Sequence, residues 1–351
     1  MTRHANHVGL DFATMVLACP HCQGDLAREA SGLRCSKCSR PYEVHEDIPL
    51  LAPSETNQPW VAEAGDPNSA AYQKHFQESD VGPRYRQRYE KRWFKRVTTR
   101  REIRQVERLL ASEPRCRRLL DIPCGGGRVS APFAAAADLL LQADLSSSQV
   151  LMARRTLGSR GNVLWFTASV FAIPLRDGTV EGAVCNRLTH HLSPVEQERV
   201  VHELLRVSTR FVILSYYDHE SFRSLGRRIR GRHPGHTIRR KDLQAWARRS
   251  GAFVDADVPL WFAGSRLRYA VLRKSECPAA DSSPSNGCEE SKRRGEQEDM
   301  ITVSSDCSWG RYRLRLGRGG CTNRFLEFCV GRGEGKSLEG WEAVASVVFD
   351  K

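Results

Sequence analysis

Four cysteines near the start of the chain have the spacing of a metal site. Cys19 and Cys22 form one Cys-x-x-Cys pair, and after twelve intervening residues Cys35 and Cys38 form a second pair. Two such pairs supply four thiolates, the ligand set of a tetrahedral Zn²⁺ site with no open position. The doubled motif disfavours the alternative of four ordinary buried cysteines. It predicts a structural zinc site rather than a catalytic one.

A second stretch with chemical potential is "LLDIPCGGGRV", in which Asp121 ends an apolar segment and three glycines follow. A phosphate-binding P-loop is excluded, because no Lys-Ser or Lys-Thr pair follows the last glycine. The spacing G-x-G-x-x-G of a dinucleotide loop is also missing. An acidic residue beside the loop suits a ligand with an ammonium and a sulfonium group, so the stretch favours S-adenosylmethionine (SAM).

The stretch "LLLQADLSSSQVLMARR" supplies a second acid at the end of the next apolar segment. Asp144 lies 19 residues after Gly125. In doubly wound sheets a carboxylate at this place accepts hydrogen bonds from the ribose hydroxyls of an adenosine. The loop and the acid together predict the SAM site more strongly than the glycines alone.

Candidate general bases follow the fourth expected strand. The stretch "NRLTHHLS" contains His190 and His191, which are the titratable side chains nearest to the expected cofactor. Methyl transfer from a sulfonium is an in-line displacement, in which holding the reactants in line supplies most of the rate. A base helps only if the nucleophile carries a proton. We expect His190 or His191 to act in that role, with loop anchoring as the alternative.

Strands and helices must alternate to position these residues. Between Arg117 and Lys274 the sequence predicts five apolar strands with intervening helices, among them a helix over 193–208 with Ser193 as its cap and Pro194 at its first position. The segments "AFVDADV" and "RLRYAVLRK" predict a closing hairpin. The expected fold is α/β, with a doubly wound, mostly parallel, seven-stranded Rossmann-like sheet.

The chain divides into four expected parts. Residues 1–51 form the zinc ribbon, 52–80 a linker, 81–274 the SAM-binding domain, and 275–351 a polar, low-complexity tail or domain fragment that we expect to be disordered. The ribbon is too small to bury an adequate core, so a metal is expected to stabilise it.

Most of the net charge of +13 comes from two arginine-rich segments, residues 84–108 and 227–241. The first is expected to be a helix whose stripe of Tyr85, Tyr89, Trp93 and Val97 packs on the domain, with its arginines in water. A role as a lid over the substrate is the alternative. Such a surface attracts phosphates of RNA, nucleotides or anionic lipids, although solvated helix faces explain it equally well.

No apolar run approaches the roughly 18–20 residues that a bilayer span needs. The first twenty residues also lack the pattern of a secretion signal. We therefore expect a cytoplasmic protein without a transmembrane segment. The sequence leaves the oligomeric state undetermined.

Four stretches resemble, in order and spacing, the motifs of class I SAM-dependent methyltransferases of the type 11 kind: "LLDIPCGGGR", "ADLSSSQVLMAR", "FTASVFAIPLRDGTVEGAVCNRLTHHL" and "HELLRVSTRFVILSYY". The resemblance covers about residues 115–274. The first 51 residues also look like the zinc ribbons that precede methyltransferase domains, a layout similar to that of bacterial rRNA guanine-N1 methyltransferases.

The resemblance implies a SAM cofactor and a role for each matching residue. Asp121, Gly125 and Gly127 correspond to residues at the methionine end, Asp144 to the ribose ligand, the segment "ASVFAIP" to the adenine border, and Asn186 to a position facing the methyl group. The candidate cofactor-binding residues are Asp121, Cys124, Gly125, Gly127, Asp144, Leu145, Ser169, Val170 and Asn186.

Three residues depart from the family pattern: Pro123 replaces a glycine, Ser169 an aspartate that bonds the adenine amino group, and Glu181 an aspartate before the fourth strand. Ser169 puts the adenine contact in doubt. The expected activity is methyl transfer to an unidentified acceptor, a small molecule or lipid, with RNA suggested by the basic segments. The alternative is a non-catalytic binding module in which the ribbon recruits a partner and the sheet is a degenerate scaffold.

Overall fold

The computed structural model describes residues 9–53, 93–158, 160–231, 236–261 and 265–275, together with the short segments 304–305, 311–316 and 324–329. The chain divides into two compact units, Met1–Pro278 and Ala279–Lys351. Most of the expected linker and the first part of the basic segment, including Tyr85 and Tyr89, lie outside the described residues.

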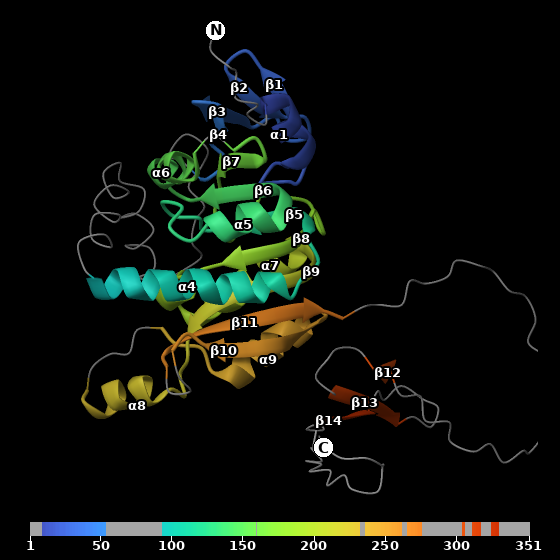
Figure 1. Ribbon diagram of the computed structural model, residues 1–351. Helices are drawn as coiled ribbons and strands as arrows, with labels where there is room; N and C mark the ends of the chain where they lie inside the picture. The colour runs from blue at the N-terminus through green and yellow to red at the C-terminus, as the bar shows by residue number, and fades with distance from the viewer. Residues whose placement is uncertain are drawn as a thin grey trace, which may run out of the picture. The chain divides into compact units, whose positions relative to one another are not determined.

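The first unit begins with a small antiparallel ribbon (Figure 1). Helix α1 (Leu10–Val16) precedes four strands, β1 (Leu26–Glu29), β2 (Gly32–Cys35), β3 (Pro41–His45) and β4 (Ile48–Pro49), which pair in the order β1-β2-β3-β4. Leu26, Leu33 and Tyr42 are buried on its inner side. These strands lie within residues 1–51, where the sequence predicts a zinc ribbon, and both cysteine pairs lie at turns.

The ribbon packs against the edge of the larger sheet. Leu50 forms a parallel bridge with Thr167, and the backbone N–H of Ala52 donates to Thr167 Oγ1 over 3.1 Å. Glu46 forms an ion pair with Arg154, and Asp25 forms one with Arg176. The ribbon therefore covers a strand edge that would otherwise present unpaired backbone groups.

The larger sheet has seven strands in the order β10-β11-β9-β8-β5-β6-β7. Their bounds are β5 Cys116–Asp121, β6 Ala137–Asp144, β7 Val163–Thr167, β8 Val180–Cys185, β9 Ser208–Tyr217, β10 Ala252–Pro259 and β11 Leu267–Lys274. Strands β5 to β9 are mutually parallel, and β11 runs antiparallel to both β9 and β10. The predicted fold class and its closing hairpin are confirmed.

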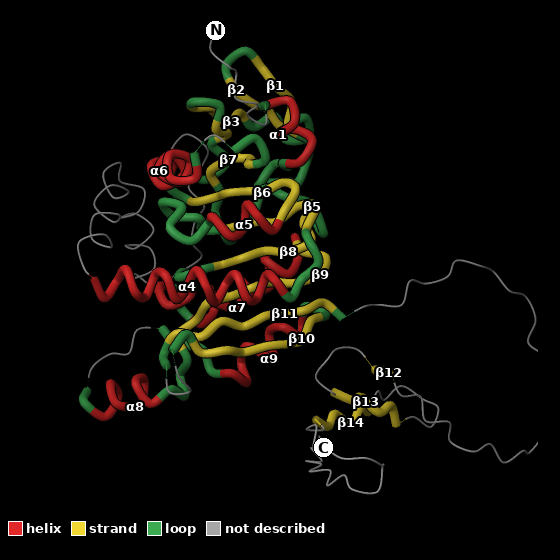
Figure 2. Tube along the Cα trace, in the orientation of Figure 1, coloured by secondary structure: helices red, strands yellow, loops and turns green. Residues whose placement is uncertain are grey.

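Helices cover both faces of this sheet (Figure 2). Their bounds are α4 Trp93–Ala111, α5 Ala131–Ala136, α6 Ser147–Leu157, α7 Pro194–Val207, α8 Phe222–Ile229 and α9 Arg240–Arg249, with a short 3₁₀ turn, η2, at Thr189–His191. Helix α7 begins as predicted, because Ser193 and Glu196 form a reciprocal capping box and Pro194 occupies the first turn.

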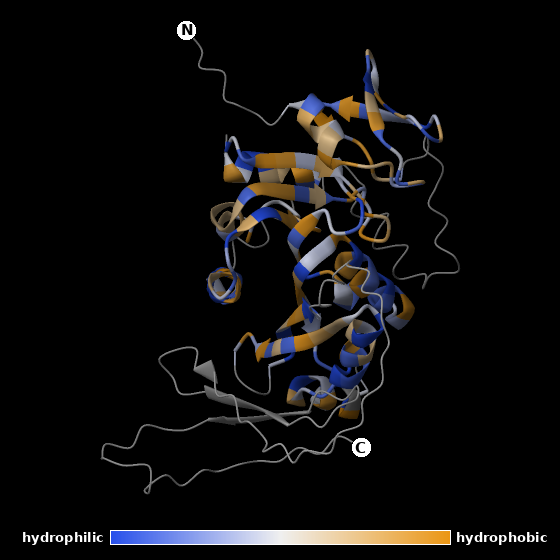
Figure 3. Cartoon of the chain, turned by 90° about the vertical axis from the view of Figure 1, so that its right-hand side faces the viewer, coloured by the Kyte–Doolittle hydropathy of each residue, from blue (hydrophilic) through white to orange (hydrophobic). Residues whose placement is uncertain are grey.

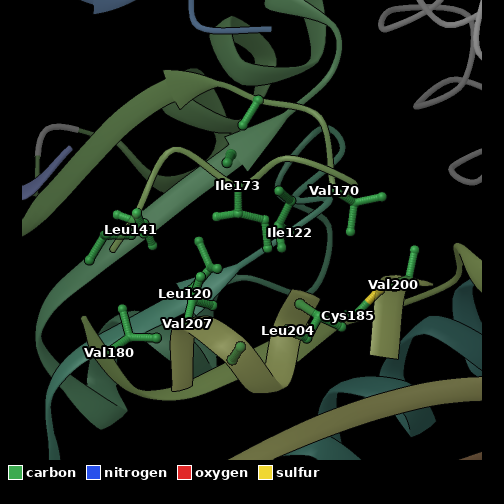
Figure 4. Packing of buried hydrophobic residues seen from close by; sticks show 14 of the residues in the cluster. Leu120, Ile122, Leu141, Val170, Ile173, Val180, Cys185, Val200, Leu204 and Val207 are labelled. Carbon is green, nitrogen blue, oxygen red and sulfur yellow. The ribbon is translucent and has the colours of Figure 1, made fainter. Parts of the chain in front are cut away.

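Alternate strand residues face opposite sides and form two hydrophobic clusters. Leu119, Leu140 and Ile213 pack with helices α4, α5 and α6, whereas their neighbours Leu120, Leu141 and Leu214 pack with α7 and α9. Figure 4 shows the second cluster, in which Val200 and Leu204 of α7 lie over Leu120 and Cys185. The apolar strands and the polar outer helix faces are visible in Figure 3. The sheet is thus buried on both faces, as parallel sheets require.

Helix α4 corrects one expectation. Trp93 is 75% exposed and Val97 39% exposed, so the predicted stripe does not pack on the domain in this part of the helix. The buried face is formed instead by Glu102, Val106 and Leu109 farther along the helix. The reason is the direction that each side chain faces: Phe94 and Arg101 of the first half of α4 contact Trp261, whereas Trp93 and Val97 are exposed. The second half of α4 runs over α5 (Figure 1).

In the second unit the described residues form three short antiparallel strands, β12 (Ser304–Ser305), β13 (Arg311–Leu316) and β14 (Arg324–Cys329). Strand β13 coincides with the alternating stretch "RYRLRL" in the sequence. We assign no function to this unit.

Candidate functional site

The carboxyl ends of the parallel strands border a cavity that opens to solvent, and its volume of about 970 Å³ includes the space at its mouth. Seven of the nine predicted cofactor-binding residues line it: Cys124, Gly125, Asp144, Leu145, Ser169, Val170 and Asn186. In open α/β sheets ligands bind outside the carboxyl ends of the strands, where the strand order reverses. Strands β5 and β8 lie side by side at this reversal.

The glycine loop between β5 and α5 borders this cavity, and two of its residues have backbone conformations that favour glycine. Gly125 and Gly127 have φ values of +55° and +73°, in the left-handed region that residues with a Cβ rarely adopt. A Cβ at Gly127 would lie 3.0 Å from Ala153 Cα on α6. Gly127 therefore serves loop packing, and it is not among the residues that line the cavity.

Asp144 at the end of β6 bridges the loop and the following helix. Its Oδ2 accepts a hydrogen bond from the backbone N–H of Gly125 over 2.8 Å, and its Oδ1 accepts one from the N–H of Ser146 over 3.0 Å. Burial raises the pKa of Asp144 to about 6, although these hydrogen bonds oppose the shift. Each oxygen retains a lone pair, so the carboxylate can accept two further hydrogen bonds.

Asp121 lies behind the cavity rather than in its lining. Its side chain is buried, and Oδ2 accepts hydrogen bonds from Ser130 Oγ and Gln142 Nε2 over 2.8 and 2.7 Å. Oδ1 has no hydrogen-bond partner among the described residues. Burial raises the pKa of Asp121 to about 7, and the nearby charge of Asp144 adds to the shift. A carboxylate buried here can attract a cationic ligand in the cavity through its charge, without touching it.

The opposite wall of the cavity comes from the ends of β7 and β8. Ser169 Oγ accepts a hydrogen bond from the N–H of Phe171 over 3.3 Å. Asn186 Oδ1 accepts a hydrogen bond from the buried Tyr269 hydroxyl over 3.1 Å. A serine is shorter than aspartate and uncharged, so this wall lacks the carboxylate that the family pattern implies at position 169.

Two arginines in the lining share one buried carboxylate. Glu102 of α4 is fully buried; its Oε2 lies 2.6 Å from Arg128 Nη1, and its Oε1 accepts a hydrogen bond from Arg187 Nε over 2.8 Å. Burial opposes the charge of Arg187, but Glu102 outweighs burial and raises the pKa of the guanidinium. The group carries a net positive charge beside the cavity. The second half of α4 is therefore tied to the glycine loop and to the end of β8.

The two candidate bases lie close together, but neither lines the cavity. His190 and His191 have ring centroids 3.9 Å apart, and His190 also lies against Tyr217 at 4.3 Å. Burial, His191 and nearby arginines lower the pKa of His190 well below its usual range, and burial lowers the pKa of His191 to about 4. Both rings are neutral at pH 7. A base of such low pKa removes protons poorly.

Sequence reasoning missed Glu102, Arg128 and Arg187. Arg128 directly follows the glycine loop and Arg187 follows Asn186, so both could have been found by extending each motif by one residue. Glu102 gives no such signal. It lies 17 residues before Leu119, where the first quoted motif begins, and it is surrounded by arginines. In an arginine-rich helix, an acidic residue is normally interpreted as a partner for neighbouring arginines on the surface.

The four cysteines of the ribbon converge. Their Sγ atoms all lie within 4.8 Å of one another, with 3.7 Å between Cys19 and Cys38 and 3.5 Å between Cys22 and Cys35. A tetrahedral zinc site with Zn–S bonds of about 2.3 Å separates its sulfurs by about 3.8 Å. The observed spacing fits that geometry. His21 and His45 are not part of the cluster.

Two equivalent turns present these thiols. After each Cys-x-x-Cys pair the next residue, Gln23 or Ser39, has a positive φ and donates its N–H to the carbonyl of the first cysteine. A Cβ at Gly24 would lie 3.0 Å from Cys35 Sγ and 2.7 Å from Lys37 Cβ, so the ribbon packs closely around the sulfurs. This donor set fits a structural Zn²⁺ and leaves no position for a substrate.

Comparisons with known proteins agree with this architecture. Residues 119–210 match the family model described as a methyltransferase domain. The magnesium protoporphyrin IX methyltransferase from Synechocystis PCC 6803 with bound SAH superposes with a TM-score of 0.51 at 16% identity, over 59% of this chain and 99% of that one. Its SAM-bound structure gives 0.48 at 17% identity, over 61% of this chain and 100% of that one. At such identities the first likeness shows a shared fold.

A search of curated proteins found no match. The expected similarity to rRNA guanine-N1 methyltransferases stays a prediction, since neither structural neighbour described above is such an enzyme. In the described part of the chain, no helix is long and apolar enough to cross a bilayer.

Proposed function

We propose that this protein is a SAM-dependent methyltransferase with a structural zinc ribbon. The observation that carries the proposal is the hydrogen bond from the Gly125 N–H to the Asp144 carboxylate. It joins the acid at the end of β6 to the glycine loop at the wall of the cavity. The match of residues 119–210 to a methyltransferase domain supports it.

The residues present fit the cofactor. Asp144 can accept the two ribose hydroxyls, Asp121 Oδ1 can balance positive charge near the methionine end, and Val170 and Leu145 supply apolar contacts for the adenine. When bound, SAM supplies an activated methyl group that passes to a nucleophile's lone pair while the carbon–sulfur bond breaks. The chain's own contribution is to bind and orient, and we assign Asn186, which lines the cavity, to the position beside the reacting atoms.

A covalent route through cysteine does not fit the described residues. Burial raises the pKa of Cys185 far above its usual range, and the same holds for Cys124 in the cavity wall. Thiols held in this way are not nucleophilic at neutral pH. His190 and His191 remain the proposed proton acceptors, but their low basicity assigns them a small share of the rate.

The acceptor is proposed to be a small molecule or lipid. Leu188, Leu192 and Phe171 make the wall near Asn186 apolar, and Arg187 adds one cation there. Such a lining suits an amphiphile with an anionic group. RNA is the second candidate, because Arg104 and Arg108 of α4 border a separate hollow beside Trp261. The proposed compartment is the cytoplasm, where thiols stay reduced and can hold zinc.

Incubation of the zinc-loaded protein with methyl-labelled SAM and separate lipid, RNA and small-molecule extracts tests the proposal. We expect label in one fraction, and loss of at least about tenfold in its rate for Asp144→Ala. The matched control is Asp138→Ala, which removes an exposed carboxylate from the same strand. A protein that binds SAM but labels none of the fractions, or that fails to bind SAM, supports the non-catalytic module.

A further inference from the structure

Helix α8 turns its serine side into the domain and exposes its apolar side. Ser221, just before the helix, and Ser224 are 2% and 1% exposed, and both hydroxyls donate to the backbone carbonyl of Asp218. Phe222, Leu225 and Ile229 are 76%, 44% and 77% exposed. A surface helix of a globular protein normally turns its apolar stripe toward the core. The reversed orientation leaves three large apolar side chains on one outer face.

The same helix is strongly basic. Residues 222–229 include no acidic side chain, and Arg223 and Arg227 are exposed beside the apolar face, followed by the exposed Arg230. Long arginine side chains can lie along apolar surface while their charged ends reach outward. An apolar stripe flanked by arginines is the composition of helices that lie in the plane of an anionic membrane surface.

A second exposed aromatic group lies at the same edge of the domain. Helix α8 follows β9, and the first turn of α4 projects on the side to which the carboxyl ends of β6 and β8 point (Figure 1). Trp93 and Phe94 in that turn are 75% and 55% exposed, and Lys95 and Arg96 follow them. Tryptophan with adjacent basic residues is typical of membrane–water interfaces.

We propose that α8, together with the first turn of α4, docks the carboxyl edge of the domain onto an anionic lipid surface. Phe222, Leu225 and Ile229 enter the headgroup region, and Arg223 and Arg227 contact lipid phosphates. The docking surface lies at the edge of the sheet that also carries the candidate cavity. Docking requires neither SAM nor methyl transfer, so this proposal can be tested independently of the proposed function.

Charge decides between this partner and two others. A second copy of the chain that pairs through α8 would bring like-charged arginines together, which disfavours the contact. A nucleic acid would satisfy the arginines but would leave the aliphatic Leu225 and Ile229 in water. An anionic lipid surface satisfies both the charge and the apolar face.

The test is sedimentation of the full zinc-loaded chain with vesicles, without SAM. One set contains phosphatidylcholine alone, and the other an equal mixture of phosphatidylcholine and phosphatidylglycerol. We expect binding to the mixed vesicles only, weakened by salt. Phe222→Ser with Ile229→Ser should lower the affinity about tenfold or more. Arg223→Gln with Arg227→Gln should also lower it about tenfold.

The matched control is Phe253→Ser, which removes an exposed aromatic side chain at the first residues of β10, the opposite end of the sheet. It should bind as the wild type does, and all variants should keep the wild-type circular dichroism spectrum. Failure of the wild type to sediment with mixed vesicles overturns the proposal, as does a Phe222→Ser/Ile229→Ser variant that binds unchanged. Self-association that this double variant abolishes, without lipid binding, overturns it in favour of a second copy.

Discussion

Glu102 lies 85 residues before Arg187 in the chain, yet its carboxylate accepts a hydrogen bond from the Arg187 guanidinium beside the candidate cavity. The same carboxylate pairs with Arg128 from the glycine loop. One buried acid thus pairs with two cations that line the cavity. This arrangement ties α4 to two residues that line the candidate cavity, although the helix precedes the match to the methyltransferase domain.

Replacing Glu102 by glutamine should separate two related ligands. Without the carboxylate, two positive charges face a ligand whose sulfonium is also positive in SAM but absent in S-adenosylhomocysteine. We expect the affinity for SAM, divided by the affinity for S-adenosylhomocysteine, to fall about tenfold in the variant. Calorimetric titration with both ligands measures the ratio.

The buried arginines left behind also destabilise the fold. The free energy of unfolding should fall by about 3–5 kcal/mol, which denaturant titration detects. The control is Glu107→Gln, an exposed position on the same helix, which should change neither quantity. An unchanged ligand ratio in Glu102→Gln would show that the two arginines do not sense the cofactor's charge.

The affinity for SAM should depend on pH through Asp144. Its raised pKa, about 6, means that the carboxyl group gains a proton as the pH falls through 6 in the ligand-free protein. A protonated carboxyl loses acceptor capacity for ribose hydroxyls, so binding must first release the proton. Between about pH 7.5 and about pH 5.5 the affinity should fall about fourfold or more.

Asp121, with a pKa of about 7, adds to the fall in the same direction. The Asp144→Asn variant should therefore bind SAM more weakly at pH 7.5. Its affinity should change less with pH than that of the wild type, but should still fall on acidification. An affinity that rises on acidification would contradict the assignment of both carboxylates.

Ser169 offers a gain-of-function test. Aspartate at this position would supply the acceptor that the family pattern places near the adenine amino group. We expect Ser169→Asp to raise the affinity for SAM about tenfold or more, since one hydrogen bond to a charged group contributes about 1.5–3 kcal/mol. Ser169→Asn has nearly the same shape without the charge and should show a smaller gain. A weaker affinity in Ser169→Asp would place the adenine elsewhere.

The histidine pair should matter little to the rate. Because the pKa of His191 is about 4 and that of His190 is also lowered, both are poor bases at neutral pH. His191→Ala and His190→Gln should each lower kcat less than about tenfold, without removing a titration between pH 6 and 8. A loss of about a hundredfold or more with either variant would establish a proton-transfer role.

Removal of the metal should reach beyond the ribbon. The ribbon shares a hydrophobic cluster with the sheet and pairs with Thr167 of β7. We expect about one zinc per chain, released by a chelator, with loss of ribbon structure first and a lower melting temperature for the remainder. Metal analysis and calorimetric melting before and after chelation measure both. Intact ribbon structure without metal would refute the zinc assignment.

The parts that could be predicted from the sequence are those in which local spacing encodes the geometry. The cysteine pairs, the strand-end Asp144 and the capped helix at Ser193 each combine chemistry and position within a few residues. The fold class could be predicted because apolar strands alternate with helices along the chain. A sheet that is buried on both faces has strands that are nearly continuous apolar runs.

The rest depends on contacts that no local pattern contains. The stripe through Trp93 and Val97 has correct helical spacing, but spacing alone does not say which side chains of a helix face the domain. Glu102 gains its role from two residues distant in the chain. The reversed orientation of α8 follows from hydroxyl contacts to one carbonyl, that of Asp218, which only the folded chain provides.

The decisive experiment is calorimetric titration of the zinc-loaded protein with SAM. We expect saturable binding of about one SAM per chain, weakened at least about tenfold by Asp144→Ala and unchanged by Asp138→Ala. No detectable binding to the wild type, or equal affinity in the Asp144→Ala variant, would contradict it.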